Sequence, residues 1–513
     1  MGSDASRWVA TFESTRTTVI ATDASGDVEA QRLCMPSVLR ARAQPSSRPS
    51  SIPLLCHSSH GPTALQSADL LVPRTMVTNQ QPPPSPPDHL ARSTIALLVS
   101  AGASGLLGVV FWIFAAHLYS SDNVGLALAE VSAMMLLSTG CQLSMATVFP
   151  RFCQQAGPKT RRLITLGYAG TATLSLAVAA AFVVLGLGRR FVPPSISGRA
   201  VFIVSVPIWT IFAIQDPALT SLRAAVCVPV ENVAYGVAKL LLLVAFAGVL
   251  SRTGVFIAWT LPVIAAVIAV NTYIYSRLLP GHMRMLDAAS ALPSSRALLT
   301  FVSGEYVASL ASITLQACPA LIVVSTLGPA AAAYLAVPWM FASTFYALIG
   351  SISTPLLVES VADPGARSVH VRRSAMIGMA IVIPLCVIVA LGAPLLLHLL
   401  GRQYAAQGTP VLRFVAAAMP FAGVNVLYLT LARVVRRVRR SVMTQVGSSV
   451  LVNGLALLLV KGHGVAGVGF AFLTGQAIVA IVVGPSLIRQ YRSLGRPGGG
   501  IGGDSAVLGL PKG

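Results

Sequence analysis

Long apolar runs, separated by short polar segments, dominate the chain from residue 93 onward. Each run approaches the ~20 residues that an α-helix needs to cross ~30 Å of hydrocarbon. We therefore predict twelve membrane-spanning helices, at residues 94–118, 124–149, 163–187, 201–222, 232–250, 255–276, 298–326, 330–357, 374–400, 410–432, 442–460 and 465–488. An even number of crossings places both termini on the same side of the membrane.

The two ends of the chain lack such runs. Residues 1–91 mix Ser, Thr, Pro and Arg without sustained periodicity and end in a proline-rich stretch, which is typical of disorder. We expect them to form a disordered extension, with Met76 as an alternative translation start. The spans then divide into an N-terminal six-helix bundle at 92–290 and a C-terminal one at 291–490, followed by a disordered tail at 491–513. The predicted fold class is an all-α integral membrane protein.

Composition and charge agree with this topology. The 513 residues are 55% hydrophobic and 10% charged, whereas soluble domains carry roughly 25% charged residues. The net charge of +20 does not indicate a nucleic-acid partner, because residues 1–91 are neutral and the excess lies in the short segments between apolar runs. If the N-terminus is cytoplasmic, 21 basic residues lie inside against 6 outside, as the positive-inside rule requires. We predict a multi-pass protein of the cytoplasmic membrane with both termini inside.

A faint internal repeat relates the two halves. The pattern Leu-Thr-x-x-Arg at 219–223 recurs at 429–433, an offset of 210, and the first and seventh spans begin about 204 residues apart. Because six helices separate equivalent points, the halves have the same orientation, as in transporters with parallel repeats.

Ionisable residues inside the spans are the candidate cavity residues, because a charge in mid-bilayer is costly and usually faces a cavity or a partner. They are Glu130, Asp216, Lys239, Glu305 and Arg413, with Glu231 and Arg223 at the inner mouth. At ~1.5 Å per residue, Asp216 lies about 9 Å, Lys239 about 12 Å and Glu305 about 10 Å from the cytoplasmic ends of their helices. Asp216 and Lys239 are therefore expected either to form a structural ion pair or to meet a substrate or coupling ion. For Glu231, a carboxylate in a first helical turn also complements the helix dipole.

Motifs for other chemistries are missing or out of context. Seven cysteines show no CxxC pattern, so neither a disulfide frame nor a zinc site is expected. Residues 462–467 match GxGxxG, but a membrane span precedes them and no acidic residue follows before Asp504, which argues against a dinucleotide site. No Walker A, HExxH or GxSxG pattern occurs. We expect no enzyme activity, no cofactor and no metal.

Several strings resemble those of one transporter family. They are Ala103–Ala116 with Val124–Ala127, Gln215–Arg223 leading into Val228–Val233 with Ala238 and Lys239, and Tyr404–Arg413. Together the region 94–490 resembles polysaccharide-biosynthesis flippases of the multidrug/oligosaccharidyl-lipid/polysaccharide exporter superfamily. The resemblance implies two six-helix bundles around a central cavity, and it adds Gln215 to the candidate cavity residues.

The resemblance also implies a function. Members of that family move a polyprenyl-pyrophosphate-linked oligosaccharide across the cytoplasmic membrane by alternating access, and such an anionic head needs a cationic, polar path. Lys239, Arg413 and the arginines at the mouth could supply that charge. The expected partners are the lipid-linked glycan, membrane lipid and a coupling ion, either H⁺ or Na⁺. Two alternatives remain: a cation-coupled multidrug exporter of the same superfamily, and a membrane-embedded glycan polymerase or ligase.

Overall fold

The structure is a computed structural model of the chain. It describes the backbone of residues 8–13, 16–22, 28–29, 87–284, 295–362, 367–434 and 438–494. Side chains are described over 102–153, 156–282, 303–350, 369, 371–373, 375–433 and 439–492. The chain divides into two units, Met1–Gln80 and Gln81–Gly513, and each unit is considered by itself.

The N-terminal unit contains a small antiparallel sheet. Strand β1 (Trp8–Glu13) pairs with β2 (Arg16–Thr22), which pairs with β3 (Val28–Glu29). These strands fall within the segment 1–91, for which the sequence analysis expected disorder, and most of that segment lies outside the described residues. Runs of Thr, Val and Ile in β2 suit a strand, because β-branched residues pack well on a pleated surface. Met76 lies outside the described residues.

The first half of the membrane unit runs from residue 87 to residue 284. Its elements are α1 (Pro87–Leu118), α2 (Ser121–Cys141), α3 (Met145–Ala156), the 3-10 turn η1 (Gly157–Lys159), α4 (Thr160–Val184), α5 (Ile196–Ser221), α6 (Cys227–Phe246), α7 (Gly254–Tyr273), the π-helical turn η2 (Ile274–Leu278) and α8 (Leu279–Arg284). Each of the six predicted spans of this half overlaps one of the long helices.

One predicted span is broken. Residues 124–149 were expected to form a single helix, but α2 ends at Cys141 and α3 begins at Met145. Between them, Leu143 and Ser144 have φ of 48° and 58°, in the left-handed region that interrupts a helix. The hydroxyl of Tyr306 donates to the carbonyl of Gly140 at 2.8 Å, which satisfies an acceptor of the last turn of α2.

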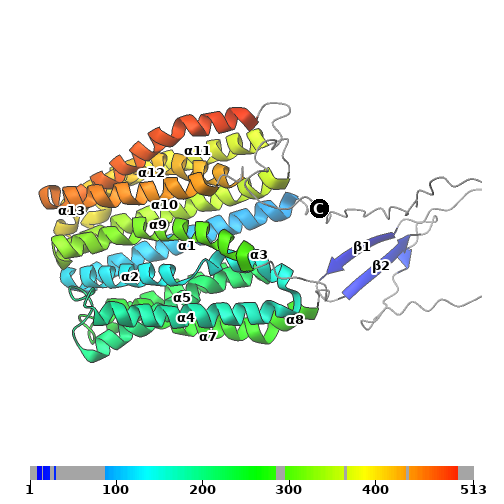
Figure 1. Ribbon diagram of the computed structural model, residues 1–513, viewed down its shortest axis with the longest axis horizontal. Coiled ribbons are helices and arrows are strands. Elements are labelled where there is room, and N and C mark those ends of the chain that lie inside the picture. The colour runs from blue at the N-terminus through cyan, green and yellow to red at the C-terminus, as the bar shows by residue number, and fades with distance from the viewer. Residues whose placement is uncertain are drawn as a thin grey trace, which may run out of the picture. The chain divides into compact units, whose positions relative to one another are not determined.

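The second half has fewer but longer helices. They are α9 (Ser295–Thr326), α10 (Pro329–Ala362), α11 (Arg367–His398), α12 (Arg402–Val434) and α13 (Val438–Leu494). Helix α13 is a hairpin of two arms, because Gly464 interrupts it with φ 59° and ψ −147°. Gly475 packs against Val452, and Gly467 against Leu459, so the two arms run antiparallel. Figure 1 shows the second arm, in red, returning along the bundle.

This architecture confirms the predicted fold class. Within the described residues, ten helices are long and apolar enough to span a membrane, and the shorter apolar segment Gly102–Leu118 of α1 adds another. Helix α13 counts once among the ten, although its two arms correspond to the predicted spans 442–460 and 465–488. The membrane unit is therefore a twelve-span helical protein, with α1 to α8 in one half and α9 to α13 in the other.

The two halves pack through α1 and α2 on one side and α9 and α10 on the other. A Cβ at Gly105 would overlap Thr344, and one at Gly108 would overlap Met340. At Gly125 of α2 a Cβ would overlap the carbonyl of Pro329, where α10 begins. Small residues at these positions therefore allow the helices of the two halves to approach closely.

Candidate functional site

The candidate site lies in the first half, where α5, α6 and α7 meet. Buried residues on α6 recur every four positions, at Glu231, Tyr235, Lys239 and Leu243, so one face of this helix carries them all toward its neighbours. Helix α5 contributes Gln215 and Asp216, and α7 contributes Asn271.

These residues form a polar cluster, which we define as Gln215, Asp216, Glu231, Asn232 and Asn271. Gln215 donates from Nε2 to Glu231 Oε1, and its own Oε1 accepts from Asn271 Nδ2 at 3.2 Å. Asn232 Nδ2 donates to Asp216 Oδ2 at 3.3 Å. The cluster therefore links side chains from three different helices.

The polar cluster carries two carboxylates and no basic partner among the described residues. Asp216 acts electrostatically on Glu231, and Asp216 Oδ1, Glu231 Oε2 and Asn271 Oδ1 are buried without a hydrogen-bond partner in the described part of the chain. An uncompensated charge is costly away from water. This arrangement can therefore take up a proton or a cation.

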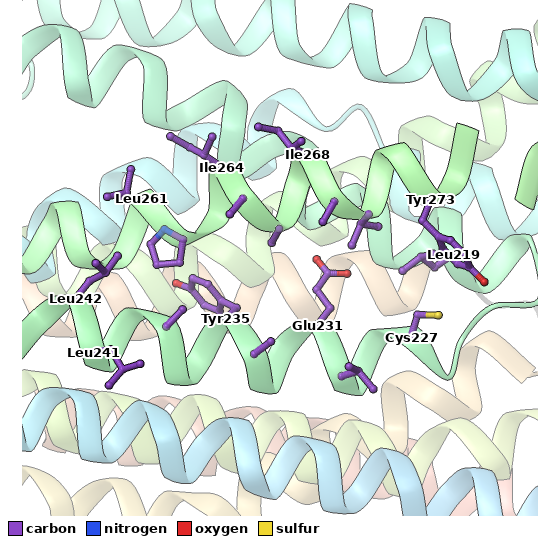
Figure 2. Close-up of a pocket in the computed structure, with 18 of the residues that line it drawn as sticks. Leu219, Cys227, Glu231, Tyr235, Leu241, Leu242, Leu261, Ile264, Ile268 and Tyr273 are labelled. Atoms are coloured by element: carbon purple, nitrogen blue, oxygen red, sulfur yellow. The ribbon is translucent and has the colours of Figure 1, made fainter. Parts of the chain in front are cut away.

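A cavity of about 1040 Å³ runs beside the polar cluster, between α6 and α7. We call it the α6–α7 groove, and Figure 2 shows it with Glu231 pointing from α6 toward α7. Its walls are aliphatic, and Val230, Leu241, Ile264 and Ile268 are exposed on the outside of the bundle. Among the described residues that line the groove, Glu231 alone is charged. The groove thus opens sideways, with a carboxylate at its inner wall.

One end of the helices is rich in arginine, and we call it the basic end. It is the end where α1 begins and α2 finishes. Its exposed arginines are Arg151, Arg161, Arg162, Arg223, Arg277, Arg372, Arg373, Arg433, Arg439, Arg440, Arg489 and Arg492. Arg223 precedes the groove residue Val226 by three positions, and Arg277 follows the groove residue Tyr273 by four. Two arginines of the basic end are therefore near groove-lining residues along the chain.

Arg223 occupies an unusual backbone position. Its φ is 62°, in the left-handed region, at the turn after α5. Ala224 N donates to Leu219 O at 2.9 Å and Arg223 N to Thr220 O at 3.1 Å, the hydrogen-bond pattern of a Schellman motif. Glycine is the usual residue at this place, so the turn holds an exposed arginine at some conformational cost.

Asp216 and Lys239 do not form the ion pair that was one of their two expected outcomes. Lys239 is 5% exposed, and its Nζ lies 3.9 Å from the ring centre of Trp259, 5.0 Å from that of Tyr235 and 5.3 Å from that of Phe111. We call these three rings the aromatic cage. Helix α6 begins at Cys227, five residues before the predicted start at 232. At ~1.5 Å per residue Lys239 is then ~18 Å from the basic end of α6, while Asp216 is only ~8 Å from that end of α5.

The remaining candidate residues lie apart from the polar cluster. Glu130 is 2% exposed on α2, where Arg252 acts on it electrostatically. Glu305 forms an ion pair with Arg433 at 3.6 Å. Arg413 is exposed, and its Nε donates to the carbonyl of Ala390 on α11 at 3.3 Å. The structure thus brings together Gln215, Asp216 and Glu231, and separates the others.

Sequence reasoning missed Asn232, Asn271 and Tyr168. The hydroxyl of Tyr168 is buried without a hydrogen-bond partner among the described residues, and both Asp216 and Glu231 act on it electrostatically. These three residues were missed because the sequence analysis selected ionisable carboxylates, lysine and arginine inside the spans and did not consider buried amides or hydroxyl groups. The signal that could have found Asn271 is an amide within an otherwise apolar span, since a buried amide requires partners.

Comparisons with known proteins agree on the fold. No family model matches the sequence, and no curated protein matches it. Solved structures do match, among them an inward-facing multidrug resistance MATE family transporter of the MOP superfamily, with a TM-score of 0.58 and 12% identity over 78% of this chain and 98% of the other. A mutant form of the Vibrio cholerae MATE transporter VcmN matches with a TM-score of 0.53 and 15% identity over 79% of this chain and 97% of the other.

A third similar structure is a MOP superfamily transporter from Pyrococcus furiosus, described as having a binding pocket of reverse polarity that suggests a different function. It matches with a TM-score of 0.51 and 13% identity over 80% of this chain and 96% of the other. At these identities the likeness establishes the fold. The membrane unit therefore has the fold of MATE transporters of the MOP superfamily.

Proposed function

We propose that this protein is a transporter that works by alternating access and moves a lipid-linked oligosaccharide across the membrane. The observation that carries the proposal is the α6–α7 groove, because it is apolar, opens sideways on the bundle and has lining residues near two arginines of the basic end along the chain. A polyprenyl chain can lie in such a groove while its diphosphate remains at the basic end. By the positive-inside rule we expect the basic end to be cytoplasmic, so the diphosphate would enter the protein from that side.

The groove and the basic end have different tasks in this mechanism. Lipid tails are as apolar as the groove walls, so a chain gains little free energy by leaving the bilayer for the groove. The groove would therefore select the lipid chain by its shape. The affinity for the substrate must then come from its diphosphate head group, which arginine suits because its planar guanidinium binds phosphate through two hydrogen bonds.

The proposal is tested with purified protein in liposomes that contain a fluorescent polyprenyl-diphosphate sugar. Ala269 lies on the groove wall, so Ala269→Trp should fill the groove and slow translocation at least about tenfold, or ~1.4 kcal/mol. Ala177 is an exposed alanine on α4, which does not line the groove, and Ala177→Trp is the matched control. Equal rates in both variants, or no translocation by the unaltered protein, contradict the proposal.

A second candidate function is the export of lipophilic cations, as in a cation-coupled multidrug exporter. The polar cluster favours it, because two carboxylates without a basic partner in the described residues adjoin an apolar groove. The same liposomes loaded with a cationic dye distinguish the two. Dye accumulation that an imposed proton or sodium gradient drives and that Glu231→Gln abolishes, without translocation of the lipid probe, would replace the flippase proposal.

We further propose that the polar cluster holds the coupling ion in either case. A single proton or monovalent cation placed between Asp216 and Glu231 would relieve their mutual repulsion and the cost of burying them. A cation could be coordinated by unpartnered oxygens of the cluster, whereas a proton on one carboxylate would donate to a single acceptor.

A further inference from the structure

Another cavity, with a polar lining, lies within the second half of the protein. It has a volume of about 190 Å³ and is bordered by α9, α10, α12 and both arms of α13. Its polar lining consists chiefly of neutral side chains, namely Ser312, Gln316, Asn425, Gln445, Ser448 and Gln476. The sequence analysis did not identify any of these residues.

The polar groups of this cavity are held by hydrogen bonds across helices. Asn425 Nδ2 donates to Gln476 Oε1 at 2.8 Å and to the Gln476 carbonyl at 3.2 Å. Gln445 Nε2 donates to Ser312 Oγ at 2.6 Å, and Gln476 Nε2 to Ser448 Oγ at 3.5 Å. Asn425 is only 5% exposed, yet its Oδ1 has no hydrogen-bond partner within the described residues. A buried amide oxygen of this kind indicates a missing donor.

The internal repeat relates this cavity to the polar cluster. Asn425 on α12 follows Gln215 on α5 by 210 residues, the offset that separates the two Leu-Thr-x-x-Arg patterns. Each half therefore has a buried amide at the equivalent position of the repeat. The halves differ in charge, because Asp216 corresponds to Val426 and Glu231 to Ser441.

Among the described residues that line this cavity, one is charged. This is Arg433, whose Nη2 lies 3.6 Å from Glu305 Oε1. The arginine side chain is 48% exposed, and an exposed ion pair of this kind is weak. Arg433 can therefore exchange Glu305 for a phosphate, which offers two oxygens to its guanidinium.

We propose that this cavity binds one sugar ring of the substrate, with the attached phosphate beside Arg433. Amide and hydroxyl groups without carboxylates suit a neutral polyhydroxylated ring, and a sugar hydroxyl supplies the donor that Asn425 Oδ1 lacks. The cavity is small, at about 190 Å³, which suits a single ring better than a longer glycan. The inference rests on the proposed function and names the part of the head that the second half recognises.

Tryptophan fluorescence can report binding. The indole Nε1 of Trp339 donates to the Gln316 carbonyl, and Gln316 lines the cavity. The full chain in nanodiscs is titrated with a panel of hexose 1-phosphates. Glucose tests binding of the sugar ring without the phosphate, and inorganic phosphate tests binding of the charge without the ring. A hexose 1-phosphate should change the fluorescence saturably, and Trp339→Phe should remove that change.

A matched pair of variants tests the site itself. Asn425→Leu should weaken binding at least about tenfold, whereas Asn453→Leu should change it less than about twofold. Asn453 is a partly buried amide that donates to the carbonyls of Thr314 and Ser449, and its Oδ1 also has no hydrogen-bond partner among the described residues, but it does not line the cavity. Equal losses in both variants would show a structural effect and overturn the site.

Other outcomes also decide the question. No saturable change with any hexose 1-phosphate, or an equal change with inorganic phosphate or sodium chloride alone, overturns the sugar assignment. If the liposome assay shows lipid translocation in that case, the proposed function stands without this inference. If a sugar phosphate binds but the lipid probe is not moved, the proposed function fails and the sugar site stands.

Discussion

The aromatic cage around Lys239 allows a stability prediction from the structure. A desolvated ammonium over a tryptophan face gains ~2 kcal/mol, and more distant rings add ~0.5 to 1 kcal/mol each. Trp259 is the nearest ring at 3.9 Å, with Tyr235 at 5.0 Å and Phe111 at 5.3 Å. The cage then contributes ~3 to 4 kcal/mol, which offsets the several kcal/mol that burying one ammonium costs.

Lys239→Met should therefore change the free energy of unfolding by less than ~1 kcal/mol, because methionine is similar in length and apolar and removes the desolvation cost together with the attraction. Trp259→Leu, by contrast, leaves a buried charge with a poorer cage and should destabilise the protein clearly.

A double-mutant cycle isolates the interaction. Trp259→Leu should cost ~2 kcal/mol less in the Lys239→Met background than in the unaltered protein, about a thirtyfold difference in the ratio of folded to unfolded protein. Trp209→Leu is the control. The ring centre of Trp209 lies 6.4 Å from that of Trp259, but Trp209 is not one of the three rings of the aromatic cage around Lys239. Reversible unfolding in mixed detergent micelles measures these free energies.

One result would refute this reasoning. A coupling free energy below ~0.5 kcal/mol would show that the cage does not hold the ammonium. A Lys239→Met variant that is stable and abundant, as predicted, but inactive in transport would show in addition that Lys239 acts on the substrate, as the sequence analysis allowed.

Three further predictions concern single positions. Glu231→Gln should make transport independent of an imposed proton or sodium gradient, and an unchanged dependence in liposomes would contradict the coupling role. Gly125→Ala should lower stability by ~1 to 3 kcal/mol through overlap with the Pro329 carbonyl, whereas Gly447→Ala, with open space around it, should be neutral in thermal melting. Arg223→Gly should be about 1 kcal/mol more stable than Arg223→Ala, because only glycine relieves the left-handed strain; equal melting temperatures would refute this.

Much of the fold could be predicted because its signals are local. A span needs about twenty apolar residues in sequence, and each of the twelve predicted spans overlaps a helix, although the span 124–149 is interrupted between α2 and α3. The errors fall at the ends and breaks of helices. The break at Leu143 and Ser144 lies beside the contact that Tyr306 makes from another helix, and such a partner is not evident from the nearby sequence.

The candidate site was predicted in part for the same reason. Gln215, Asp216 and Glu231 were found because charge and family resemblance marked them, and they lie together. Asn425 was not found, although the repeat offset of 210 from Gln215 would have identified it. Neutral amides carry no charge signal, so only their hydrogen-bond partners show that they are part of a site.

By itself the sequence determined which segments enter the membrane and where the basic residues gather, because both depend on the free energy of transferring each residue from water. Only the tertiary structure decided which polar side chains meet. Depth along a helix is a single coordinate, whereas contact also requires the right rotation of each helix and the right neighbour. Lys239 therefore meets Trp259 of α7, and Asp216 meets Asn232 of α6, although the sequence placed the lysine and the aspartate at a similar depth.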